Sequence, residues 1–243
     1  NNDLKEILLW LKKDFKFIFV DELLKSKNKN GLCALTFDDA YKSVFEHTLP
    51  MLKDIGIPCT IYIVGNTINK KIFWRDKIRF IIKNNLIDEF ISYIPINLKK
   101  NINNKNFYFM TKNRKINSKL FDYQIDKFLS DKNIEISEFN YCIDNLNYLE
   151  KSDLVSYGNH TYNHYVLSSL TYEEQFQEIN SNHELLKKLN IQKSNVFSLP
   201  FGRKEDLNED TYKILNNLKY KGILMSRNRL NYKNKIINNN LRE

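Results

Sequence analysis

Short apolar runs alternate with helix-like segments, and this alternation constrains the fold more than any other feature of the sequence. Residues 32–37 and 59–64 are predicted to be buried strands, and residues 43–55 between them a helix with one apolar face. A separation of about 20 to 25 residues from strand to strand is typical of parallel strands joined by helical crossovers. The sequence therefore predicts an α/β fold.

The same alternation returns in the C-terminal half of the chain. Thr171 and Glu174 match a capping box, and apolar residues follow at helical spacing as far as residue 190. The other expected elements are helices over 2–14, 73–83 and 209–218 and strands over 17–20, 154–158, 195–199 and 222–225.

Residues 69–150 interrupt this pattern. They hold one helix-like stretch and then Asn- and Lys-rich pieces broken by Pro95. We therefore expect a single domain over residues 1–243 with an inserted helical or irregular subdomain at about 69–150. Phe107, Tyr108 and Phe109 within it are interpreted as core residues in the first place, with a wall that stacks on sugars as the alternative.

Composition excludes several classes of protein. Only six glycines occur, far apart, whereas the dinucleotide fingerprint and the phosphate-binding loop both need clustered glycines. The net charge of +9 is spread along the chain without a run of five Lys or Arg residues. We therefore expect no nucleic-acid partner, while peripheral contact with an anionic membrane surface stays open.

Membrane spans and disulfides are not expected either. The apolar runs are far shorter than the roughly 20 residues that cross a bilayer. Three cysteines without Cys-x-x-Cys spacing indicate reduced structural thiols, which favours the cytoplasm or the cytoplasmic face of a membrane. The oligomeric state is left open.

Polar residues follow three of the expected strands at the point where each strand ends. Asp38 and Asp39 close the first, His160 and His164 the second, and Ser-Leu-Pro-Phe-Gly at 198–202 the third. Parallel α/β folds build their active sites at this edge of the sheet.

Each of these motifs alone has a simpler explanation: a helix-capping carboxylate, a surface pair of histidines, or a strand-ending turn. Their combination favours chemistry. One carboxylate and two imidazoles from separate strand ends can bind one metal ion and leave positions open for water and substrate, with a second carboxylate beside them as a base.

The strings TFDDA at 36–40, HTYNH at 160–164 and SLPFG at 198–202 resemble the first three motifs of the NodB-homology polysaccharide deacetylases, carbohydrate esterase family 4. The resemblance spans most of the chain outside about 85–150. It implies a distorted (β/α)7-type barrel.

The resemblance also implies a set of site residues. A divalent ion, usually zinc, would be bound by Asp39, His160 and His164. Asp38 would be the general base, and the backbone N–H of Phe201 would hold the oxyanion. Pro200, Phe201 and Tyr162 would contact the substrate, an N-acetylated amino sugar.

Two departures from the family pattern concern the geometry of the site. Ala40 stands where the family often has glycine, which is tolerable unless φ is positive there. Ser198 replaces the arginine that commonly opens the third motif, and the aspartate that pairs with this arginine is also missing, since no Asp follows Asp210. Another group must then orient Asp38, and we expect Arg203 or Arg227 to do so.

A third departure concerns the mechanism. The family's fifth motif supplies a histidine as general acid, but no histidine follows His183 in this sequence. The alternatives are an acid beyond residue 243, return of the proton by Asp38 or by metal-bound water, or binding without turnover.

The sequence thus predicts a metal-dependent hydrolase of carbon–nitrogen amide bonds. It would remove the acetyl group from an N-acetylated amino sugar in a bacterial surface polysaccharide or its precursor. The alternatives are a deformylase or deacetylase of a lipid- or nucleotide-linked sugar, and a catalytically impaired carbohydrate-binding relic.

Overall fold

The computed structural model of the chain describes residues 2–99, 101–228, 236–238 and 241–242 and shows a mixed α/β fold. In this part of the chain the strands form three small sheets. All neighbouring strands are parallel except the two nearest the C-terminus, which are antiparallel to each other. The sheets are β1 (Lys16–Phe17) with β2 (Leu32–Cys33); β3 (Leu35–Phe37), β4 (Cys59–Ile63) and β5 (Val155–Asn159); and, in spatial order, β6 (Val196–Ser198), β7 (Gly222–Leu224), β9 (Leu241–Arg242) and β8 (Ile236–Asn238).

The register of the central sheet brings the ends of its strands to one edge. Phe37 pairs with Ile61, and Ile61 pairs with Tyr157, so β3, β4 and β5 run level with one another. Tyr157 also receives the backbone N–H of Ser194 at 2.8 Å, which sets the segment leading into β6 beside β5. The residues after β3, β5 and β6 therefore emerge close together.

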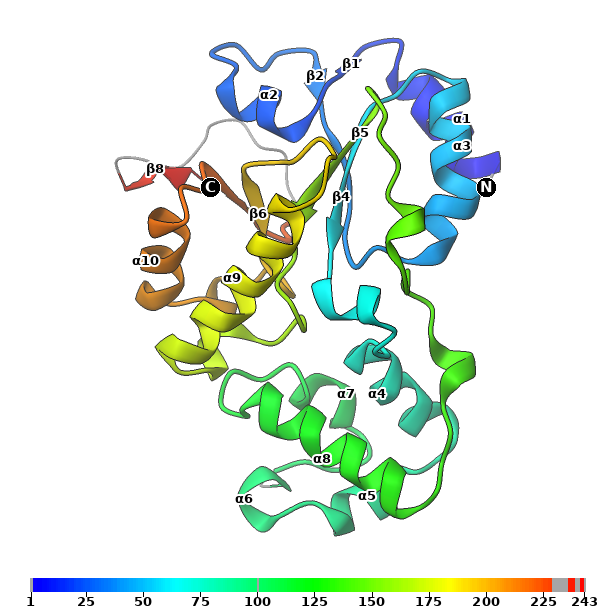
Figure 1. Cartoon of the computed structure of the whole chain (residues 1–243), viewed down its shortest axis with the longest axis vertical. Coiled ribbons are helices and arrows are strands. Elements are labelled where there is room, and N and C mark those ends of the chain that lie inside the picture. Colours follow the sequence, from blue (N-terminus) through cyan, green and yellow to red (C-terminus); the bar gives the residue numbers. More distant parts are fainter. Residues whose placement is uncertain (1, 100, 229–235, 239–240, 243) are drawn as a thin grey trace.

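Helices surround these strands (Figure 1). The helices that flank the strands are α1 (Asn2–Leu11), α2 (Val20–Lys25), a π-helical turn (Val44–Thr48) that continues into α3 (Leu49–Asp54), α9 (Tyr172–Lys187) and α10 (Glu209–Asn217). The helices of the inserted segment are α4 (Trp74–Lys83), α5 (Ile87–Tyr93), α6 (Ile96–Lys99), α7 (Phe107–Met110) and α8 (Ser118–Asp131). Short 3₁₀ turns occupy Gly65–Asn69, Ser137–Phe139, Leu146–Tyr148, Leu167–Ser169 and Lys204–Asp206.

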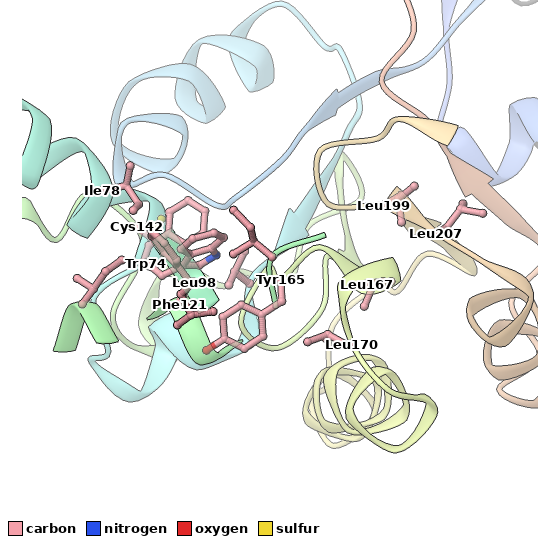
Figure 2. Packing of buried hydrophobic residues seen from close by; sticks show 14 of the residues in the cluster. Trp74, Ile78, Leu98, Phe121, Cys142, Tyr165, Leu167, Leu170, Leu199 and Leu207 are labelled. Carbon is pink, nitrogen blue, oxygen red and sulfur yellow. The ribbon is translucent and has the colours of Figure 1, made fainter. Parts of the chain in front are cut away.

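The inserted helices gather at one end of the molecule, the lower end in Figure 1, but they share a core with the strands. One cluster of buried side chains runs from Trp74 and Phe121 through Tyr165 to Leu199 beside β6 (Figure 2). Packing of α4 against this cluster ties the inserted segment to the loops at the strand ends.

Most predicted elements are confirmed within a few residues, including the helix after the capping box of Thr171 and Glu174. The strand predicted over 17–20 is wrong beyond Phe17, because Val20 begins α2. The Glu22 side chain there accepts the backbone N–H of Phe19, which favours the first helical turn over an extended chain.

The sequence analysis missed a long helix. α8 lies in the part of 69–150 that was expected to be irregular, yet Phe121, Ile125 and Phe128 stand at helical spacing and are fully buried. Asn117 caps this helix by accepting the backbone N–H of Leu120 at 3.0 Å.

The described helices include none that is both long and apolar enough to span a bilayer. Cys33, Cys59 and Cys142 are free thiols, as the sequence predicts.

Gly158 in β5 provides a test of the packing between β4 and β5. A Cβ atom at this position would lie 2.2 Å from Cε1 of the buried Tyr62 ring. We expect Gly158→Ala to lower the free energy of unfolding by about 1–3 kcal/mol, as measured by urea denaturation. Tyr62→Leu in the same chain should remove part of this loss, and an equal loss in both backgrounds would contradict the packing argument.

Candidate metal centre and catalytic site

Three side chains from two strand ends converge on one point. Asp39 follows β3, and His160 and His164 follow β5. Oδ1 of Asp39 lies 3.4 Å from Nε2 of His160 and 3.3 Å from Nε2 of His164. One ligand atom from each residue lies within 4.8 Å of the other two, so a single ion can contact all three.

The donor set fits a divalent cation. Oδ1 of Asp39 is buried yet accepts no hydrogen bond from the described residues. Nδ1 of His160 lies 2.9 Å from the carbonyl oxygen of Ser198. Because a carbonyl only accepts, Nδ1 carries the proton, and in the neutral ring the lone pair of Nε2 faces Asp39. Two imidazoles and one carboxylate with an open fourth position are the ligands of catalytic zinc sites.

Burial and mutual charge shift the pKa values of this cluster. Burial alone would raise the pKa of Asp39, but His164 and His160 lower it to about 2. Burial alone would lower the pKa of His160, but the carboxylates of Asp38 and Asp39 raise it to about 9. Burial lowers the pKa of His164 to about 3. Without an ion, the proton of the cluster therefore resides on His160.

Backbone strain is concentrated at the same loops. Asp39, Ala40, Thr161, His164 and Phe201 all have φ between 55° and 67°, a left-handed conformation that costs a non-glycine residue about 1 kcal/mol or more. The sequence analysis treats alanine at position 40 as tolerable unless φ is positive there. Ala40 has φ 55°, so alanine at this position carries a backbone strain that glycine would not.

Helix α9 holds the loop that carries both histidines. Nδ2 of Asn182 donates to the carbonyl of Thr161 at 2.9 Å and to Oδ1 of Asn159 at 3.0 Å. Glu178 accepts the backbone N–H of Asn163 at 2.7 Å, and burial raises the pKa of Glu178 to about 7. These buried bonds fix the turn between His160 and His164.

The start of α4 encloses His164 from the side of the inserted segment. The Phe73 ring meets the His164 ring edge-on at 5.1 Å, and Nε1 of Trp74 donates to the His164 carbonyl at 3.0 Å. The Phe201 ring lies 4.8 Å from the same imidazole. The sequence analysis missed these supporting roles, although Phe73 and Trp74 lie within the part of the chain that the family resemblance spans.

Ser198 orients Asp38. Its hydroxyl donates to Oδ1 of Asp38 at 2.8 Å, while its carbonyl accepts from His160. The expectation that Arg203 takes this part is wrong, because its guanidinium is engaged by Asp206 and by the carbonyl of Lys112. Arg227 lines a cavity of about 370 Å³ together with Asp38 and Ser198.

The remaining predicted substrate contacts lie around this site. Pro200 is buried, and Phe201 adjoins the metal cluster through His164. The Tyr162 ring packs against Gly65, and its hydroxyl accepts from Asn69 at 2.9 Å, so its described contacts lie outside the cluster. Gly202 completes the third motif, since it has φ 71° and its Cβ would lie 2.3 Å from the backbone nitrogen of Ser226.

The three aromatic residues of α7 have different surroundings. Phe107 is a core residue, as favoured by the sequence analysis, whereas Phe109 is 74% exposed. Tyr108 is half-buried, with Nζ of Lys112 3.9 Å from its ring centre and the guanidinium of Arg75 5.0 Å away. Arg75 itself is buried against Trp74 and donates to Thr111 at 2.8 Å.

Comparison with known proteins assigns the chain to a family. The family model described as polysaccharide deacetylase matches residues 25–223, which is most of the chain. The chain therefore belongs to the polysaccharide deacetylase family and is a hydrolase of amide bonds, which confirms the resemblance seen in the sequence. No curated protein sequence matches it.

Solved structures with a similar fold include IcaB from Ammonifex degensii, with 16% identity, a TM-score of 0.53, and coverage of 93% of this chain and 76% of that one. At this identity the likeness shows a shared fold. The deacetylase domain of BpsB from Bordetella bronchiseptica is 15% identical, with a TM-score of 0.49 and coverage of 91% and 76%. The Streptococcus pyogenes deacetylase PplD, in complex with acetate, is 16% identical, with a TM-score of 0.47 and coverage of 89% and 67%.

The two bonds of Ser198 can be tested separately. Ser198→Ala removes the hydroxyl that holds Asp38 but leaves the backbone carbonyl on His160. We expect kcat for amide hydrolysis to fall about 10- to 100-fold, because Asp38 loses a hydrogen bond to its charged carboxylate. The affinity of the protein for zinc, measured by calorimetry, should stay the same. Ser198→Thr should retain most of the activity. Parallel losses of zinc affinity and kcat in Ser198→Ala would contradict this division.

Proposed function

We propose that this chain is a divalent-metal-dependent deacetylase that hydrolyses the N-acetyl group of an amino sugar in a bacterial surface polysaccharide or its precursor. The observation that carries the proposal is the convergence of Asp39, His160 and His164 beside Asp38. Family membership supplies the reaction class. The family barrel, in a distorted seven-stranded form, is the architecture we propose for the strands.

Asp39, His160 and His164 would hold the ion, and the chemistry of this donor set favours Zn²⁺. When bound, such an ion lowers the pKa of a water toward about 7 and polarises the amide carbonyl. Oδ1 of Asp38 is engaged by Ser198, so Oδ2 is the atom that takes the proton from the attacking water. The backbone N–H of Phe201 would donate to the developing oxyanion, and Pro200 and Tyr162 would border the sugar.

The departing amine needs a proton, and Asp38 is the group that we propose returns it. His183 is engaged with the hydroxyl of Tyr220 at 3.1 Å, and His47 is exposed on the π-helical turn after Tyr41. Attack of water leaves Asp38 as a carboxylic acid. This acid is therefore the group that donates a proton to the departing amine in the second step. The same residue would act as base and then as acid.

Acetate release tests the proposed reaction. The zinc-loaded protein should release acetate from oligomers of N-acetylglucosamine, and Asp38→Asn should lower kcat by about 10²- to 10⁴-fold, because a positioned proton acceptor is lost. Zinc binding by this variant, measured by calorimetry, should persist. A protein that binds zinc and sugar but releases no acetate would instead be the carbohydrate-binding relic.

Metal affinity should depend on pH. The raised pKa of His160 means that, below about pH 9, the imidazole must lose a proton before it can bind an ion. Each bound ion then displaces one proton, so zinc affinity should rise about tenfold per pH unit as pH increases from 6 to 8. Calorimetry in buffers of different ionisation enthalpy measures the released proton. An affinity that is constant across this range would contradict the assignment of His160 as a ligand.

A further inference from the structure

Two cations of the inserted segment lie close to the third motif without a carboxylate partner. Arg75 on α4 is only 3% exposed, and Lys112, which follows α7, is partly exposed. Among the described residues, no carboxylate forms an ion pair with either of them. An enclosed charge is costly unless a charge of opposite sign accompanies it. An anion from outside the chain would therefore be stabilised beside these two side chains.

Other cations near the site are neutralised by the protein itself. Arg79 binds the carboxylate of Asp76, and Lys42 forms an ion pair with Asp144 at 2.8 Å. Both cations line a cavity of about 520 Å³ beside Tyr41, the residue that follows the first motif. An anion in this cavity would have to compete with the two carboxylates, which is not the case beside the pair described above.

Both cations of the pair lie against the same two aromatic rings. The guanidinium carbon of Arg75 is 5.0 Å from the ring centre of Tyr108 and 5.5 Å from that of Phe201. Nζ of Lys112 is 3.9 Å and 5.8 Å from the same two ring centres. The two charges are therefore at most 8.9 Å apart. A ring face attracts an ammonium group but occupies few of its N–H donors, so Lys112 keeps donors for a ligand.

The two side chains that can reach a ligand are Lys112 and Tyr108, since both are partly exposed. The Arg75 guanidinium is enclosed, and it is held by a hydrogen bond to Thr111 at 2.8 Å and by the Trp74 ring at 4.6 Å. Arg75 therefore provides a fixed positive charge next to the groups that would contact the ligand.

The sequence around Lys112 has the same sign of charge. Between Glu89 and Asp122 the chain contains seven Lys or Arg residues and no Asp or Glu. Burial alone would raise the pKa of Tyr108, but Lys112 and Arg75 lower it. The electrostatic potential around Tyr108 is therefore positive, which attracts anions.

Phe201 connects the pair to the candidate metal centre. Its ring centre is 4.8 Å from that of His164 and 5.8 Å from Nζ of Lys112, so Nζ lies at most 10.6 Å from the centre of the His164 ring. One sugar ring and a substituent on it can bridge such a distance. An anionic substituent on the sugar at the metal centre could therefore reach Lys112.

We infer that Lys112 and the hydroxyl of Tyr108 bind an oxyanion, a carboxylate or a phosphate, carried by the sugar whose acetamido group is hydrolysed. The inference rests on the proposed function and specifies its substrate class. The preferred substrate is an amino sugar with an anionic substituent, and the segment around α7 provides this specificity.

Kinetics on four sugars with the zinc-loaded protein test the inference. The sugars are N-acetylglucosamine, its 1-phosphate, its 6-phosphate and the uronic acid of N-acetylglucosamine, so that phosphate and carboxylate are compared on one ring. The wild type should have a KM for at least one anionic sugar about tenfold below that for the neutral sugar, because a charge-assisted hydrogen bond is gained. The sugar with the lowest KM identifies the oxyanion and its position.

Variants of Lys112 assign the preference to this site. Lys112→Gln should raise the KM for the preferred anionic sugar about five- to tenfold and leave the KM for the neutral sugar unchanged. Lys112→Arg retains the charge and should retain the preference. Lys115→Gln, which removes an exposed lysine of the same segment, is the matched control and should also retain it.

Equal KM values for the neutral and all anionic sugars, or a preference that Lys112→Gln leaves unchanged, would overturn the anion site while acetate release still supports the proposed function. A rise of the neutral-sugar KM in Lys112→Gln as large as that for the anionic sugar would overturn it too. Calorimetry with the Asp38→Asn protein separates the opposite case. Binding of an anionic sugar that needs Lys112, in a protein whose wild type never releases acetate, would retain the site and overturn the deacetylase. Absence of both binding and hydrolysis of the anionic sugars would overturn the site as well.

Discussion

The contact between one carboxylate oxygen of Asp39 and the two imidazole nitrogens of His160 and His164 is the interaction on which the site depends. A buried carboxylate oxygen without a hydrogen-bond donor is costly, and a divalent cation is the partner that would offset this cost. The surrounding loops hold the three side chains together although several of their residues adopt left-handed backbone conformations. Buried hydrogen bonds from α9 and aromatic packing from the start of α4 hold the loops in these strained conformations.

Ser198 stands where the family pattern given in the sequence analysis has an arginine, and it holds Asp38 without that arginine's aspartate partner. A single residue at the end of β6 directs one ring nitrogen of His160 through its carbonyl and one oxygen of Asp38 through its hydroxyl. Both groups belong to Ser198, which lies on a strand, and a strand is more rigid than a loop. Replacement of a buried charged pair by a neutral hydroxyl also avoids the desolvation cost of two ions.

The inserted segment, residues 69–150, is joined to the strand ends by packing. Its helices share one hydrophobic cluster with the strand ends, so its position relative to the metal centre is fixed by packing. The same segment supplies Asn140 and Tyr141 to the cavity beside Tyr41. A region that shows little pattern in the sequence therefore forms one wall of the cavity next to the candidate metal centre.

The sequence by itself determined the alternation of strands and helices and the capped helix α9, because hydrophobic spacing and capping are local signals. It also predicted Asp38, Asp39, His160 and His164 as site residues from strand-end chemistry, and the structure brings Asp39, His160 and His164 within reach of one ion. The sequence also predicted that the three cysteines are free thiols. It did not identify α8, because Asn- and Lys-rich surroundings masked the spacing of Phe121, Ile125 and Phe128. The tertiary structure alone decided that Ser198 and not Arg203 holds Asp38, that Ala40 is left-handed, and that Cys142 pairs with Tyr41. Each of these depends on contacts between residues distant in the sequence. A local sequence pattern does not show which distant side chain will contact it.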